Sequence, residues 1–245
     1  MKDKRNIIVT GANSGIGLAC VKQFIENGDR VIAIVRNKES KTELLDSLRN
    51  KNSLDIHYLD LENSNDLKIN LNKIINIYKN IDVLVNNAGK IFNGLVQMTS
   101  KDKFADLFSL NFYAPLELIQ NVSKKMIRSK KGSIINVSST SSEDCNVGRS
   151  AYSSSKAALE SLTKTLAFEL GPFNIRANCI LPGLTNTKLM IKNTDAKILE
   201  QVVKNISLGR IAETQEIAHL VTFLASEQSS YITAQTIRID GGMRR

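Results

Sequence analysis

The stretch Asn6-Ile-Ile-Val-Thr10-Gly11-Ala-Asn-Ser-Gly15-Ile-Gly17 carries a β-rich run directly into a glycine turn, and helically spaced apolar residues follow it. Glycines let the chain turn tightly and let a pyrophosphate approach backbone N–H groups at the start of a helix. The spacing Gly-x-x-x-Gly-x-Gly differs from Gly-x-Gly-x-x-Gly, so the turn is a variant dinucleotide-binding motif. We therefore expect the dinucleotide to be bound by Thr10, Gly11, Asn13, Ser14, Gly15, Ile16 and Gly17.

Strand-like and helix-like runs alternate along the rest of the chain. The run Arg30-Val-Ile-Ala-Ile-Val35 is almost wholly apolar, as expected of a strand buried on both faces of a parallel sheet. Such alternation predicts an α/β fold: a single Rossmann-type domain over residues 1–245, with a doubly wound, mainly parallel sheet and helices on both faces. Ligands of such sheets bind beyond the carboxyl ends of the strands. The expected strands are 6–9, 30–35, 55–59, 81–85, 133–137, 175–180 and 236–239, and the expected helices are 17–26, 38–50, 64–79, 100–129, 151–170 and 214–225.

The bulk composition argues against several other classes of protein. Cys20, Cys145 and Cys179 are scattered without a Cys-x-x-Cys pair, which favours a reducing cytoplasm and disfavours a disulfide framework. The two histidines lie far apart, so we expect no metal site. The longest apolar runs are strand-sized, so we expect neither a signal peptide nor a membrane span. Lys+Arg minus Asp+Glu is 33 − 24 = +9, but the basic runs lack interleaved aromatics, and we expect no nucleic-acid partner.

The end of the second expected strand indicates which coenzyme is used. An acidic residue about 20 residues after the glycines would bind the ribose diol of NAD. The strand here ends Val35-Arg36-Asn37, without an acid. Because a guanidinium can grip a phosphate through two parallel hydrogen bonds, Arg36 predicts NADP(H).

The run Ser150-Ala-Tyr-Ser-Ser-Ser-Lys156 places Tyr152 and Lys156 on one face of the expected helix. A free tyrosine titrates near pH ~10, and a lysine cation about 4 Å away, at an effective dielectric of roughly 20, favours the phenolate by at most about 4 kcal/mol. That is roughly three pKa units, so we expect the pKa of Tyr152 to lie near neutrality. With Ser139 upstream to hold a substrate oxygen, the three residues predict acid–base chemistry on a carbonyl or an alcohol.

Several motifs occur in a fixed order: the glycine turn, Asn86-Asn-Ala-Gly89, Asn111, Ser139, Tyr152, Lys156 and Pro182-Gly183. In this order they resemble the short-chain dehydrogenase/reductase family over nearly the whole chain. The segments Leu208-Gly-Arg-Ile, Tyr231-Ile-Thr and Asp240-Gly-Gly-Met243 look most like the bacterial 3-oxoacyl-[acyl-carrier-protein] reductases of that family. The resemblance implies an enzyme that moves a hydride between NADP(H) and a carbonyl or alcohol carbon, assembled as a homotetramer or homodimer.

The resemblance also implies a role for individual residues. Tyr152 acts as the general acid in reduction and the base in oxidation, and Lys156 lowers its pKa and binds the nicotinamide ribose. Ser139 holds the carbonyl oxygen, and Asn111 helps to hold a water in a proton relay. The further coenzyme contacts that it implies are Asp60 and Leu61 at the adenine, Asn87, Ala88 and Gly89 in the cleft, and Pro182, Gly183, Thr185 and Thr187 in the loop that holds the carboxamide and phosphates.

The sequence leaves the substrate open. Where the carrier-protein reductases have an arginine for docking, this chain has Phe173, whereas the other docking position keeps a basic residue, Lys130. Residues 144–149 are expected to border the pocket, where Arg149 either favours an anionic or sugar substrate or is an exposed charge. Residues 184–208 are expected to form a helical lid. The alternatives are a 3-oxoacyl thioester, with docking of acyl carrier protein undecided, and a sugar, steroid or other small ketone. A protein of a different class, a non-catalytic NADP-binding sensor, also fits the fold.

Overall fold

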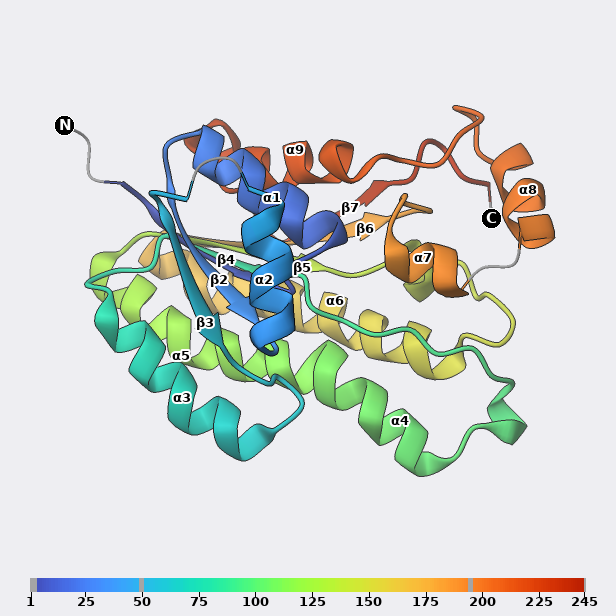
Figure 1. The fold of residues 1–245 in the computed structure, drawn as a ribbon, viewed down its shortest axis with the longest axis horizontal. Coiled ribbons are helices and arrows are strands. Elements are labelled where there is room, and N and C mark those ends of the chain that lie inside the picture. The colour runs from blue at the N-terminus through green and yellow to red at the C-terminus, as the bar shows by residue number, and fades with distance from the viewer. Residues whose placement is uncertain (1–3, 49–50, 194–195, 245) are drawn as a thin grey trace.

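The computed structural model describes residues 4–48, 51–193 and 196–244. Its centre is a seven-stranded sheet in the order β3-β2-β1-β4-β5-β6-β7, and every pairing between these strands is parallel (Figure 1). The order reverses between β1 and β4, as in a doubly wound sheet, so the predicted fold class is confirmed. The strands are β1 (Asn6–Thr10), β2 (Arg30–Val35), β3 (Leu54–Tyr58), β4 (Val83–Asn86), β5 (Gly132–Val137), β6 (Ile175–Pro182) and β7 (Thr236–Ile239).

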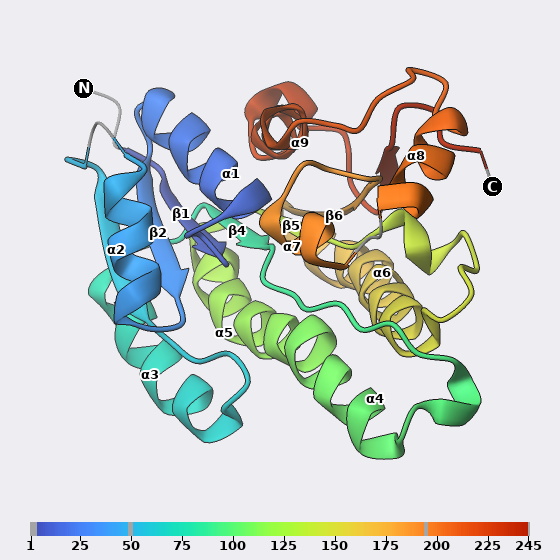
Figure 2. The same cartoon turned by 45° about the vertical axis from the view of Figure 1, so that its right-hand side comes forward.

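Alternating side chains of the strands build two apolar layers, one on each face of the sheet. In β1, Ile7 and Val9 belong to one layer and Ile8 to the other. The first layer is covered by α1, α2 and α9, and the second by α3, α5 and α6 (Figure 2). These helices are α1 (Gly15–Glu26), α2 (Lys38–Asp46), α3 (Ser64–Ile77), α5 (Ala114–Ser129), α6 (Ser150–Leu170) and α9 (Thr214–Leu224).

The helical region predicted over 100–129 is confirmed, with one irregularity. It consists of α4 (Lys101–Phe108) and α5, joined by a π-helical turn at Ser109–Tyr113. Such turns inside α-helices are frequent at functional sites. Asn111 lies in this turn and is fully buried.

The remaining differences from the predicted elements lie at their ends. Strand β6 runs on to Pro182, because it pairs with β7 as far as Ile239. Helix α2 ends at Asp46, short of the predicted end, and residues 49 and 50 of that prediction lie outside the described residues.

The expected lid region, 184–208, contains two helices, α7 (Lys188–Asn193) and α8 (Ala196–Lys204), and its residues 194 and 195 lie outside the described part. Among the described residues, no helix combines the length and apolar character that crossing a bilayer requires.

Candidate active site

A cavity of about 910 Å³ opens at the carboxyl ends of the strands. Its wall is made by segments that follow β1 to β6 and by the lid region. Of the predicted site residues, all but Thr10, Gly17 and Asn111 lie in this wall. Segments far apart in sequence therefore meet at one site, as the topology of a doubly wound sheet predicts.

The turn after β1 can exist only with glycines at its contact points. Gly11 and Gly15 have φ values of +62° and +53°, in the region that favours glycine. A Cβ atom on Gly17 would lie 2.2 Å from the carbonyl oxygen of Gly11, closer than any non-bonded contact allows. The turn is thus a backbone cradle at the start of α1, and this geometry fits the phosphates of a dinucleotide.

Thr10 and Asn87 join this turn to the segment after β4. The Thr10 hydroxyl accepts hydrogen bonds of 3.0 Å from the backbone N–H groups of Asn87 and Ala88. The Asn87 amide donates to the carbonyl oxygens of Thr10, at 3.0 Å, and of Gly11, at 3.3 Å. Thr10 therefore lies behind the cavity wall and supports it.

Arg36 follows β2 at the mouth of the same cavity and is exposed. It forms no ion pair with any residue in the described part of the chain. Asp60 lies near it in the wall, and its carboxylate accepts a 3.0 Å hydrogen bond from the backbone of Glu62. A guanidinium placed in this way can receive a phosphate.

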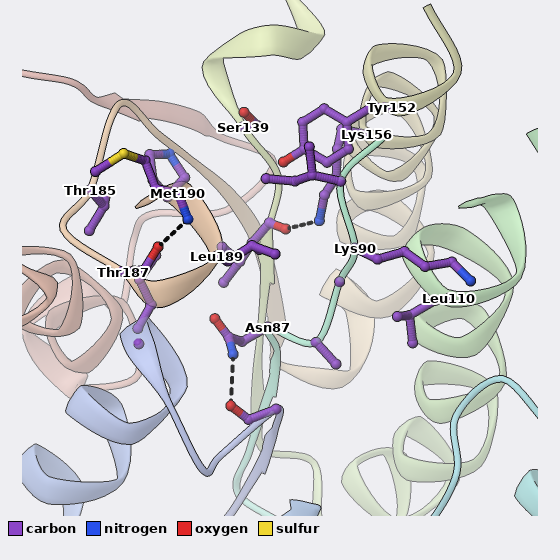
Figure 3. Close-up of a pocket in the computed structure, with 18 of the residues that line it drawn as sticks. Asn87, Lys90, Leu110, Ser139, Tyr152, Lys156, Thr185, Thr187, Leu189 and Met190 are labelled. Atoms are coloured by element: carbon purple, nitrogen blue, oxygen red, sulfur yellow. Dashed lines mark hydrogen bonds between the residues drawn. The ribbon is translucent and has the colours of Figure 1, made fainter. Parts of the chain in front are cut away.

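Ser139, Tyr152 and Lys156 come together at the inner end of the cavity. Tyr152 and Lys156 lie side by side on α6, with Ser139 across from them at the end of β5 (Figure 3). The Ser139 hydroxyl lies beside the phenol of Tyr152 (Figure 3) and acts to lower its pKa. The Lys156 ammonium donates a 2.8 Å hydrogen bond to the carbonyl oxygen of Val137. The adjacent Ser138 also lines the cavity, and its hydroxyl donates a 2.6 Å hydrogen bond to the buried carboxylate of Glu160.

The surroundings of Tyr152 shift its pKa in the opposite direction to the one expected. Burial raises the pKa of Tyr152 above its usual value of 10.0, and only smaller opposing effects come from the Ser139 hydrogen bond and the Arg149 charge. Burial also lowers the pKa of Lys156, to about 8, although Cys179 and Glu160 oppose that shift. The prediction of a phenol pKa near neutrality through Lys156 was therefore wrong, because it took no account of burial.

Asn111 contacts the segment after β4 rather than the cavity. Its side-chain oxygen accepts a 2.9 Å hydrogen bond from the Lys90 backbone N–H. Its amide donates to the Lys90 carbonyl, at 3.0 Å, and to the Ser155 hydroxyl, at 3.1 Å. Asn111 thus ties α6 to the loop that carries Gly89, and its predicted role in a water relay stays a prediction.

Several residues of the wall escaped the sequence reasoning. Lys90 directly follows the Asn86-Asn-Ala-Gly89 motif and pairs with Glu62, at 2.8 Å, and Asp106, at 2.6 Å. Its position beside a motif could have indicated it, but its two partners could not be found from spacing, because Glu62 follows β3 and Asp106 lies in α4. The others that were missed include Ile91, Asn93, Leu110, Ser141 and Met243.

Two predicted borders of the pocket do lie in the wall. Asn146, Val147 and Arg149 represent the 144–149 segment there. Leu184, Lys188, Leu189, Met190 and Val202 represent the lid region. Closure of that region over a substrate stays a prediction.

A parallel doubly wound sheet, a glycine cradle and a Ser–Tyr–Lys centre in one cavity define the class of dinucleotide-dependent oxidoreductases. A family model described as enoyl-(acyl carrier protein) reductase matches residues 11–244. The chain belongs to this family, the short-chain dehydrogenases/reductases, so the predicted family and enzyme class are confirmed.

Individual relatives agree with that membership. The chain is 35% identical over 240 residues to the 3-oxoacyl-[acyl-carrier-protein] reductase FabG of Chlamydia pneumoniae, which covers 98% of this chain and 96% of that protein. It is 36% identical to the FabG protein of Thermotoga maritima, with 96% of both chains covered. A solved structure of YwfH, an NADPH-dependent reductase involved in bacilysin biosynthesis, superposes with a TM-score of 0.92 at 26% identity over 99% of each chain.

Proposed function

We propose that this protein is an NADP(H)-dependent oxidoreductase that reduces a carbonyl group to an alcohol. The observation that carries the proposal is the meeting of Ser139, Tyr152 and Lys156 in the wall of a cavity that also contains the glycine cradle. The described residues contain no group of three or more His, Cys, Asp or Glu side chains suited to a metal ion.

Backbone and side chains would hold different parts of the coenzyme. The cradle around Gly11 and Gly17 would receive the pyrophosphate, and Arg36 would receive the 2′-phosphate of the adenosine. When bound, NADPH supplies a hydride to the carbonyl carbon. The YwfH structure, described as that of an NADPH-dependent reductase, supports this choice of coenzyme.

The residues at the inner end of the cavity manage the proton. Because burial raises the pKa of Tyr152, its phenol carries a proton at neutral pH, as a donor to a carbonyl oxygen must. Ser139 lies beside that phenol and holds the substrate oxygen next to it. Lys156, with a pKa of about 8, is still mostly an ammonium at pH 7 and stabilises the phenolate left after proton transfer.

A 3-oxoacyl thioester is the first substrate to consider, because the two FabG relatives are named as reductases of 3-oxoacyl groups on acyl carrier protein. The docking surface for such a carrier would include Lys130 and Phe173, which lie close together: the Asn174 amide bonds the Lys130 carbonyl at 3.2 Å. A small ketone is the second candidate, favoured by Phe173 at the place of a docking arginine and by Arg149 in the cavity wall.

The assembly and location follow the family resemblance. We infer a homodimer or homotetramer, with contacts that use the exposed aromatic residues Tyr113 and Phe168 beside and on the long helices. The three cysteines are free, in keeping with a cytoplasmic protein. Both inferences stay predictions.

The decisive test is NADPH oxidation, followed by its absorbance, with acetoacetyl-CoA and a panel of small ketones. Turnover with any of them that disappears in Tyr152→Phe supports the proposal. Tight NADPH binding without turnover of any carbonyl would favour the non-catalytic sensor instead.

A further inference from the structure

Arg149 occupies a distinctive position in the cavity wall. It is the residue before α6 and lies three positions ahead of Tyr152. Its guanidinium carbon lies 5.8 Å from the centre of the Tyr152 ring, both residues line the cavity, and the Arg149 side chain is half-buried. A cation is therefore held next to the group that donates the proton.

The Arg149 side chain has no ion pair or hydrogen bond to any residue that the structure describes. The nearest acids along the chain, Glu143 and Asp144, pair instead with Arg238, at 3.0 and 2.8 Å. The guanidinium instead lies over the Tyr152 ring, and burial lowers its pKa.

The other cations deep in the cavity differ from Arg149 in this respect. Lys90 pairs with Glu62 and Asp106, and Lys156 donates to a backbone carbonyl. The acidic residues of the described wall, Asp60 and Glu62, both follow β3 at the far side of the cavity. Among the wall residues that the structure describes, the part around Tyr152 thus contains a half-buried cation and no acid to compensate it.

A half-buried cation without a counter-charge is costly unless a ligand supplies one. A carboxylate matches a guanidinium well, since two parallel hydrogen bonds can form. A thioester offers no charge at this point. The Arg149 site is therefore suited to a substrate that carries its own acid near the reacting carbonyl.

We propose that Arg149 binds a carboxylate of the substrate, so that the protein reduces an oxo acid, a compound with a carboxylate within a few bonds of its ketone. The inference rests on the proposed function and specifies its substrate class. The ketone carbon gains a hydride, its oxygen takes the Tyr152 proton, and the carboxylate is unchanged. The short separation follows because Arg149 and Tyr152 are in direct contact.

The test compares each oxo acid with its own ethyl ester, which keeps the ketone and removes the charge. The panel is 2-oxopentanoate, acetoacetate and levulinate, in which the two groups are one, two and three bonds apart. With NADPH, we expect kcat/KM for at least one acid to exceed that of its ester by about tenfold to hundredfold, the range of a hydrogen-bonded charge pair. Arg149→Gln should abolish this preference, and Arg149→Lys should restore part of it.

Two further measurements separate charge recognition from a general loss of activity. Lys188→Gln removes an exposed charge from the same wall and should leave the acid-to-ester ratio at the wild-type value. Calorimetric titration of the Tyr152→Phe protein with the preferred acid, in the presence of NADPH, should give a Kd that Arg149→Gln raises at least about tenfold.

Each outcome bears on one of the two proposals. Turnover of the esters or of acetoacetyl-CoA at rates equal to or above the acids, unchanged in ratio by Arg149→Gln, would overturn the oxo-acid inference and leave the reductase function standing. Absence of NADPH oxidation with every acid, ester and thioester would overturn the function itself.

Discussion

One half of the cavity is formed mainly by backbone atoms, and the other half is formed mainly by side chains. The half around β1, β2 and β4 is mostly backbone: a glycine cradle whose shape depends on missing side chains. The half around Ser139, Tyr152 and Arg149 is made of side chains whose charges are set by burial and by partners elsewhere in the chain. A backbone site can be recognised from local sequence, whereas the chemistry of a side-chain site depends on the surrounding fold.

We expect the largest effect from Tyr152→Phe, which changes the side-chain half of the cavity and leaves the backbone half intact. Removing the proton donor should lower kcat about 10²- to 10⁴-fold, while the Kd for NADPH stays nearly the same. Steady-state kinetics and NADPH titration would measure the two quantities. Tyr231→Phe, at an exposed tyrosine, serves as the control. Turnover near the wild-type rate in Tyr152→Phe would remove Tyr152 from the mechanism.

The matching test of the backbone half is Arg36→Asp, at the exposed arginine after β2. A carboxylate would repel the 2′-phosphate and accept the ribose hydroxyls, so the ratio of kcat/KM with NADPH to that with NADH should fall about tenfold or more. Lys38→Asp makes the same charge change two residues away, outside the cavity wall, and should move the ratio less. A higher kcat/KM with NADH than with NADPH in the wild-type protein would contradict the role assigned to Arg36.

Gly17→Ala tests whether the cradle depends on absent side chains. Its new Cβ would meet the Gly11 carbonyl oxygen, so the free energy of unfolding should fall by about 1–3 kcal/mol. NADPH binding should weaken as the turn shifts. Gly171→Ala is the matched control, since a Cβ there meets nothing within 4 Å and φ is −53°. Equal stability of the two variants in thermal melts would show that the turn tolerates side chains.

The smallest expected effect on activity is a change in the pH dependence of kcat/KM, which is set by the charge of Lys156. Because the pKa of Lys156 is lowered to about 8, the ammonium of the free enzyme is lost as the pH rises through that value, and kcat/KM for reduction should fall above it. The charge of Glu160 raises the pKa of Lys156, so Glu160→Gln should move this decline to lower pH. Glu169→Gln, exposed on the same helix, should leave it in place.

The lowered pKa of Lys156 should also make the free energy of unfolding depend on pH. The pKa of Lys156 in the folded protein lies below its ordinary value of 10.5, so the unfolded chain binds more protons between about pH 8 and 10.5. The contribution of this lysine to stability therefore rises with pH across that window. Unfolding midpoints of the wild type and of Lys156→Met, compared at pH 7 and pH 10, would measure it. A difference that does not change with pH would contradict the lowered pKa.

The sequence by itself determined the sheet, the helices that cover it and the backbone cradle. Apolar runs such as 30–35 and the glycines at 11, 15 and 17 act through local conformation, which needs no knowledge of distant residues. Only the tertiary structure decided that Tyr152 has a raised pKa, that Asn111 bonds Lys90, and that Glu143 and Asp144 pair with Arg238 rather than with Arg149. These properties come from burial and from partners brought together by the fold, and neither can be read from spacing along the chain.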